Sequence, residues 1–193
     1  MGLTNATYDL FISDNISNLT KPQIKTIYPK FKTKDYIPNL VLNQVFTNRF
    51  PNDKYPIIFA IIRKVKYLNQ LYNSFARSLK KIDSAKPRIN EYFDIIFKGE
   101  AILLFLGQII DLINCLNGSK LFEKEDNSIW QRAYSLHNDI KHEKTELISE
   151  KKLQVIQIDN DGIYNSNTNL NYEELRKILI LLNKEINEIL TLK

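Results

Sequence analysis

Glycine and proline are rare along most of the chain, and this scarcity restricts the folds that it can adopt. Only five glycines and six prolines occur among 193 residues, and long stretches run without either. Because both residues weaken or interrupt helix interiors, such stretches favour long helices. Residues 1–35 are different: they are polar and predict short or irregular segments.

The stretch Ile57–Ile82 has the clearest helical periodicity. On a wheel of ~100° per residue, nine apolar residues cover one broad arc: Ile58, Ile61, Val65, Leu68, Leu71, Tyr72, Phe75, Leu79 and Ile82. Five basic residues gather in a separate arc: Arg63, Lys66, Arg77, Lys80 and Lys81. We expect a helix whose apolar stripe packs on a core and whose basic stripe faces solvent or an anionic partner.

Further helices are expected over residues 88–116, 129–149 and 171–190, and a weaker one over residues 33–50. Residues 88–116 are apolar nearly all round in the middle, which predicts a central position, and the single cysteine, Cys115, is expected in the core there. Asn171 and Glu174 have the spacing of a capping box. Alternation around Asp161-Gly162 predicts a short β-hairpin over residues 153–165.

These elements predict an all-α fold, a four-to-five-helix bundle with a small β-hairpin before the last helix. No linker-like stretch separates two cores, so residues 1–193 are expected to form a single helical domain. Within it, residues 56–193 make up the bundle, and residues 1–55 form an N-terminal extension that the pattern does not place.

Composition narrows the class of protein. One cysteine leaves no internal disulfide framework, and "MGLTNATYDL" lacks a secretory signal, so the cytoplasm is the expected compartment. The longest apolar runs are too short to span a membrane. Residues 1–87 carry a net charge of +9 and residues 88–193 a net charge of −4, which indicates either an anionic partner for the first half or only a lysine-rich soluble surface.

Both histidines of the chain lie in one stretch, "IWQRAYSLHNDIKHEK". With Arg132 at 0° on the wheel, the apolar face lies at about 40–100°, His137 at about 140° and His142 at about 280°. A polar strip therefore runs along one flank of the core, formed by His137, Lys141, Tyr134 and Asn138.

These residue types suit the cleavage of a phosphodiester without a metal. Histidine can take or give a proton near neutral pH, and arginine can donate two parallel hydrogen bonds to a phosphate. A histidine at the edge of a core is nevertheless more often a structural residue, and charged neighbours are more often a solvated face. No cofactor is expected, because no glycine-rich phosphate loop occurs, and no metal, because one cysteine and two histidines cannot build a common zinc site.

The segment "RAYSLH" resembles the R-x4-H form of the signature of the HEPN superfamily, and "YSLHNDIKH" resembles its N-x-x-K-H variant. The resemblance covers about residues 56–193. It implies a metal-independent endoribonuclease of a toxin–antitoxin, abortive-infection or related antiviral defence system. RNA would be the substrate, and a homodimer would bring two motifs into one cleft.

Carried over to this chain, the resemblance implies that Arg132 stabilises the scissile phosphate and that His137 acts as general base or acid. Tyr134, Asn138, Lys141 and His142 would then contact the substrate. His142 could instead be the acting histidine. The alternative function is a non-catalytic HEPN-like helical module that binds a partner protein, such as an antitoxin, or a nucleotide in a defence system.

Overall fold

The computed structural model describes six continuous stretches and a few isolated residues. The described residues are 38, 40, 41, 44, 50–81, 89–118, 127–142, 156–159, 161–165 and 167–191. The interpretation of residues 1–35 as irregular lies outside them. Of the predicted helix over residues 33–50, Pro38, Leu40, Val41 and Gln44 are described as helical, and Leu40 is fully buried.

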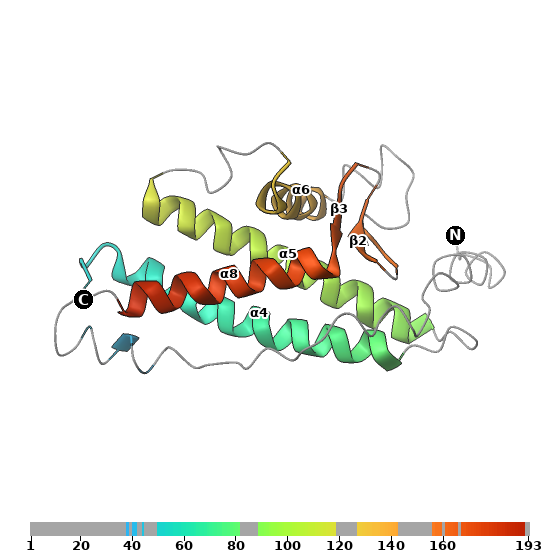
Figure 1. The fold of residues 1–193 in the computed structure, drawn as a ribbon, viewed down its shortest axis with the longest axis horizontal. Helices are drawn as coiled ribbons and strands as arrows, with labels where there is room; N and C mark the ends of the chain where they lie inside the picture. Colours follow the sequence, from blue (N-terminus) through green and yellow to red (C-terminus); the bar gives the residue numbers. More distant parts are fainter. Residues whose placement is uncertain are drawn as a thin grey trace.

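The fold is all-α with a small sheet, as predicted (Figure 1). Two long helices, α4 (Tyr55–Lys81) and α5 (Ile89–Asn117), lie along each other. Their bounds match the predicted ones to within two residues. Gly118 follows α5 with a φ of +66°, and its N–H donates to the carbonyl of Asn114. This left-handed position explains why "NGSK" ends the helix.

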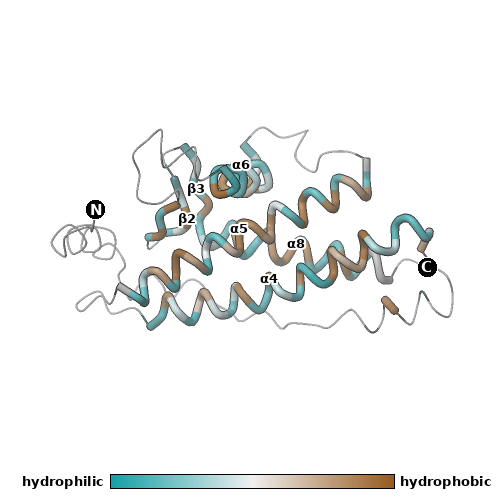
Figure 2. Tube along the Cα trace, turned by 180° about the vertical axis from the view of Figure 1, so that it is seen from behind, coloured by the Kyte–Doolittle hydropathy of each residue, from teal (hydrophilic) through white to brown (hydrophobic). Residues whose placement is uncertain are grey.

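The core lies between α4, α5 and the last helix, α8 (Tyr172–Thr191). Figure 2 shows hydrophobic residues dominating the middle of α5, whereas hydrophilic residues recur along α4. Leu68, Phe75, Ile95, Leu106 and Leu175 have no exposed surface. Burying a side chain of this size stabilises the fold by roughly 1.5–3 kcal/mol. These buried side chains therefore hold the three helices together.

A pair of asparagines crosses this core. Asn69 of α4 is 1% exposed. Its Nδ2 donates to Oδ1 of Asn183 on α8 at 2.9 Å, and Nδ2 of Asn183 donates to Oδ1 of Asn69 at 3.1 Å. The second hydrogen of Asn183 Nδ2 reaches the carbonyl of Leu179. The two amides thus satisfy each other inside an otherwise apolar contact.

The short helix α6 (Ile129–Lys141) packs across α5 (Figure 1). Ser128 caps its start, since Ser128 Oγ accepts a hydrogen bond from the N–H of Gln131. His142 caps its end with φ −100° and ψ 19°. Residues 143–149 of the helix that was predicted out to Ser149 lie outside the described residues.

A three-stranded antiparallel sheet precedes α8. It consists of β1 (Gln157–Ile158), β2 (Gly162–Tyr164) and β3 (Asn169–Asn171), in the order β1-β2-β3. The predicted hairpin is the β1–β2 pair, with Ile158 opposite Ile163, and β3 adds a strand that was not predicted. Buried side chains of this sheet pack on α5, where a Cβ at Gly99 would lie 2.7 Å from Cδ1 of Ile158.

The predicted capping box at the start of α8 is present. The N–H of Glu174 donates to Oδ1 of Asn171 at 2.8 Å, and the N–H of Asn171 donates to Oε2 of Glu174 at 3.1 Å. Both bonds satisfy N–H groups that have no partner within the helix. None of the helices in the described part of the chain is both long and apolar enough to cross a membrane.

Candidate functional site

The motif residues of α6 point to two different places. Arg132 lies near the start of the helix and is directed at β3 and α8, whereas His137 lies one and a half turns later and is directed at α5. Arg132 hydrogen-bonds Asn169 and Glu174, whereas the ring of His137 packs on Gly107. The fold of one protomer therefore does not bring Arg132 and His137 together on one phosphate.

Arg132 is held by Glu174 of α8. Its two terminal nitrogens donate to the two carboxylate oxygens of Glu174, Nη2 at 2.5 Å and Nη1 at 3.1 Å. Nη1 also contacts the carbonyl and Oδ1 of Asn169 at 3.1 and 3.3 Å. The side chains of Arg132 and Glu174 are only 19% and 23% exposed. Arg132 thus forms a bidentate ion pair that joins α6 to the start of α8.

The ion pair also sets the protonation of Glu174. Burial raises the pKa of this carboxyl, but the hydrogen bonds from Arg132 and from the N–H of Asn171, together with the charge of Arg132, lower it below its ordinary value. Glu174 is therefore ionised at neutral pH and neutralises the guanidinium. A phosphate would have to compete with this carboxylate for Arg132.

His137 is buried, with 4% of its surface exposed. Its ring lies directly over Gly107 of α5, where an added Cβ would overlap the imidazole. Nδ1 is buried and has no hydrogen-bond partner of ordinary geometry. A glycine is needed at position 107 because the ring occupies the space that any side chain would fill.

Burial lowers the pKa of His137 below its usual range. The charge of Asp111 and the carbonyl of Leu103 oppose this shift, whereas the charges of Lys141 and His142 add to it. The imidazole is therefore neutral at pH 7. A neutral histidine can act as a general base, but this one presents little surface to a substrate.

Asp111 of α5 completes the cluster around His137. The phenol of Tyr134 donates to Oδ1 of Asp111 at 2.7 Å, and the rings of Tyr134 and His137 are 5.6 Å apart between centroids. The hydrogen bond to Asp111, and then burial, raises the pKa of Tyr134. The sequence analysis missed Asp111. The spacing of Gly107 and Asp111 could have indicated it, because the two residues are one helical turn apart on α5 and both face α6.

The other residues of the predicted strip lie toward the end of α6. Asn138 is half-buried, and its carbonyl accepts the N–H of His142 at 2.9 Å. Lys141 and His142 are exposed. Of the two histidines, His142 is thus the one that solvent or a ligand can reach.

The basic stripe of α4 faces outward. Arg63, Arg77, Lys80 and Lys81 are exposed and Lys66 is partly so. The 27 residues of α4 include six basic and no acidic ones. On the helical wheel the centre of this stripe lies about 130° from the centre of the buried residues of α4, so most of the stripe faces solvent.

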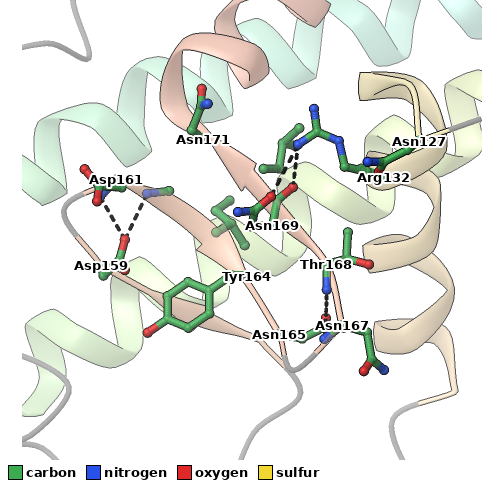
Figure 3. Close-up of a pocket in the computed structure, with 13 residues that line it drawn as sticks. Asn127, Arg132, Asp159, Asp161, Tyr164, Asn165, Asn167, Thr168, Asn169 and Asn171 are labelled. Atoms are coloured by element: carbon green, nitrogen blue, oxygen red, sulfur yellow. Dashed lines mark hydrogen bonds between the residues drawn. The ribbon is translucent and has the colours of Figure 1, made fainter.

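A polar cavity of about 550 Å³ lies between the sheet and the start of α6 (Figure 3). Asparagine, aspartate and threonine side chains form most of its wall, together with Tyr164 and Arg132. The sequence analysis missed it, although five polar residues of the segment 165–171 line it. The sequence did contain a signal for the cavity: a dense run of polar residues between the apolar strand positions Ile163 and Leu170.

The chain offers no obvious metal centre where it is described: no three His, Cys, Asp or Glu side chains gather there. Cys115 is exposed, so its predicted place in the core was wrong. Cys115 follows Asp111 by one turn and shares its outward face of α5. No family model, curated protein or solved structure matches the chain.

Proposed function

We propose that the chain is a helical RNA-binding module of the HEPN type that acts in a toxin–antitoxin or phage-defence system, and that Arg132 and His137 stabilise its fold rather than cut RNA. The observation that carries the proposal is the engagement of both residues. Arg132 gives both terminal nitrogens to Glu174, and His137 is packed on Gly107 with 4% exposure.

The basic stripe of α4 supports RNA as the partner. Its five cations span positions 63–81, which is about 27 Å along a helix, and α4 itself carries no carboxylate; the charge of Lys81 helps to lower the pKa of Asp94 on α5. Tyr67 is 47% exposed and meets Phe105 of α5 edge-on, with ring centroids 6.4 Å apart. Cations interleaved with an exposed aromatic ring suit single-stranded RNA, whose phosphates and unstacked bases they can bind.

A salt titration tests this role. If all five cations contact phosphates of a single strand, the logarithm of the binding constant should fall with the logarithm of the salt concentration with a slope of about −3.5. Neutralising two of them in Lys80→Gln/Lys81→Gln should reduce the slope to about −2.1. Fluorescence anisotropy with a labelled single-stranded RNA measures both.

The matched control neutralises two exposed lysines of α8, in Lys177→Gln/Lys184→Gln. It changes the net charge equally but leaves α4 intact. Equal slopes for the two double variants would mean that RNA responds only to overall charge, and unchanged binding in the α4 variant would refute the proposal.

A second candidate function is metal-independent RNA cleavage by a homodimer, with His142 as the acting histidine. The exposure of His142 and Lys141 at the end of α6 favours it, because a proton donor must reach the substrate. Because Arg132 is engaged by Glu174 in each copy of the chain, the exposed Lys141 of one protomer would have to bind the phosphate. Dimerisation through α6 remains a prediction, which light scattering would check.

Cleavage assays separate the two candidates. A ribonuclease of this kind should cut RNA but not DNA, since DNA lacks the 2′-OH, and should be insensitive to chelators. His142→Ala should slow it by about 10²–10⁴-fold, whereas a folded His137→Ala should retain activity. Intact RNA after incubation with the wild-type protein would leave the binding module as the function.

A further inference from the structure

We propose that the polar cavity beside the sheet is a binding site for the vicinal hydroxyl groups of a neutral sugar ring. The site is separate from the basic stripe of α4 and does not depend on the RNA-binding proposal. Its volume of about 550 Å³ is within the range of small-molecule sites.

The charges around the cavity exclude an anionic ligand. Among the described residues of its wall the one cation is Arg132, which is already neutralised by Glu174. Asp159 and Asp161 add two carboxylates at the opposite end (Figure 3). A phosphate or carboxylate ligand would meet net negative charge there, so the site disfavours anions, which leaves a ligand without negative charge.

The amide side chains determine the hydrogen-bonding character of the site. Asn127 and Asn169 lie beside Arg132, and Asn167 lies at the turn between β2 and β3, next to Asn165 and Thr168 (Figure 3). An amide carries both a donor and an acceptor, and a hydroxyl group requires both. Oδ1 of Asn169 is used by Arg132, which leaves its Nδ2 as a donor. A ligand with hydroxyls on adjacent carbons matches such a wall.

The carboxylates complement the amides. Oδ1 of Asp159 accepts the N–H groups of Asp161 and Gly162 at 2.8 and 3.0 Å, and these bonds fix the turn between β1 and β2. The exposed carboxylate of Asp161 lies at the rim of the cavity. Carboxylates accept strong hydrogen bonds from hydroxyl groups, so this end suits a vicinal diol.

Tyr164 is the aromatic residue among the described residues that line the site (Figure 3). The neighbouring side chains of Ile163 and Leu170 are fully buried in the core. Burial and the charge of Asp159 raise the pKa of Tyr164, so its phenol remains a neutral donor. One apolar ring face with polar groups around it fits a sugar ring, which has one C–H face and a polar edge, better than a base, which stacks on both faces.

The hydroxyl chemistry could come from a free sugar or from the ribose of a nucleoside, and titration calorimetry distinguishes them. The probes are glucose, ribose, adenosine and 2′-deoxyadenosine. Saturable binding of glucose or ribose assigns a free sugar. Binding of adenosine that 2′-deoxyadenosine does not reproduce assigns a nucleoside ribose.

Variants locate the binding in the cavity. Asn167→Ala removes an exposed amide but keeps the backbone N–H that holds the turn. It should weaken binding up to about tenfold, as should Asp161→Asn. Asn90→Ala, an exposed asparagine of α5 outside the cavity, should bind as the wild type does.

Several results would overturn the proposal. The first is that none of the four probes binds saturably. The second is that adenosine and 2′-deoxyadenosine bind equally well while neither sugar binds. The third is that Asn90→Ala and Asn167→Ala weaken binding equally. Binding of calcium chloride or inorganic phosphate in the cavity, lost in Asn167→Ala, would assign an ion site instead.

Discussion

Replacing Arg132 by alanine should destabilise the fold, because it leaves the largely buried carboxylate of Glu174 without its partner. Both side chains are about four-fifths covered. Breaking a fully buried pair by removing one partner costs about 3–5 kcal/mol, whereas an exposed pair contributes about 0–1 kcal/mol. For this intermediate pair we expect Arg132→Ala to lower the free energy of unfolding by about 2–3 kcal/mol. For a chain of this length, Tm should fall by about 4–12 °C.

A double-mutant cycle isolates the ion pair from other effects. Glu174→Gln removes the charge but keeps an acceptor for the N–H of Asn171, so the capping box is largely retained. The coupling free energy between Arg132→Ala and Glu174→Gln should be about 1–2 kcal/mol. Urea denaturation monitored by circular dichroism gives all four free energies of unfolding.

The chain contains a matched control pair in Lys184 and Glu188. These side chains are 71% and 56% exposed and their charged atoms are 3.6 Å apart, so their coupling should not exceed about 0.5 kcal/mol. If Arg132→Ala left the free energy of unfolding unchanged, the structural role of Arg132 would be refuted, and its retention for chemistry would become the better explanation.

Two further predictions concern His137. Gly107→Ala should lower the free energy of unfolding by about 1–3 kcal/mol, because the new methyl group overlaps the imidazole, although alanine is the better helix former by about 1 kcal/mol. The same change in a His137→Ala background should be neutral or stabilising, and an equal loss in both backgrounds would contradict the contact. Because burial lowers the pKa of His137, the unfolded chain binds a proton more readily, and the free energy of unfolding should decrease as pH falls below about 6.5. Denaturation curves at about pH 7.5 and about pH 5.5, roughly one unit on either side of the histidine pKa in the unfolded chain, should show this decrease in the wild type and a smaller one in His137→Gln.

Helix periodicity made most of the fold predictable. The apolar stripes of α4 and α8 repeat over many turns, so their existence and faces followed from local spacing. Local spacing failed at β3, where Asn169–Asn171 contains one apolar residue and pairs only because β2 lies beside it.

The candidate site was harder to predict, because its partners are distant in the chain. The wheel placed His137 at the edge of the core and Arg132 at the other edge of the stripe, and both positions fit the structure. It could not reveal that Glu174, 42 residues away, binds Arg132, or that Gly107 makes room for the imidazole. Such pairings depend on tertiary packing, which one sequence without homologues does not encode in its spacing.

The amide pair between α4 and α8 has a consequence for the uniqueness of the fold. Apolar ridges alone permit neighbouring helices to slide past each other by a turn at modest cost, because most leucine and isoleucine contacts can be exchanged for similar ones. A slide would separate Asn69 from Asn183 and leave an amide that is 1% exposed without partners, at roughly 1–3 kcal/mol for each unsatisfied group. Two asparagines in an apolar seam thus select one axial register for α8, as single buried asparagines do in coiled coils. That register is what places the first turn of α8, and with it Glu174, within reach of Arg132.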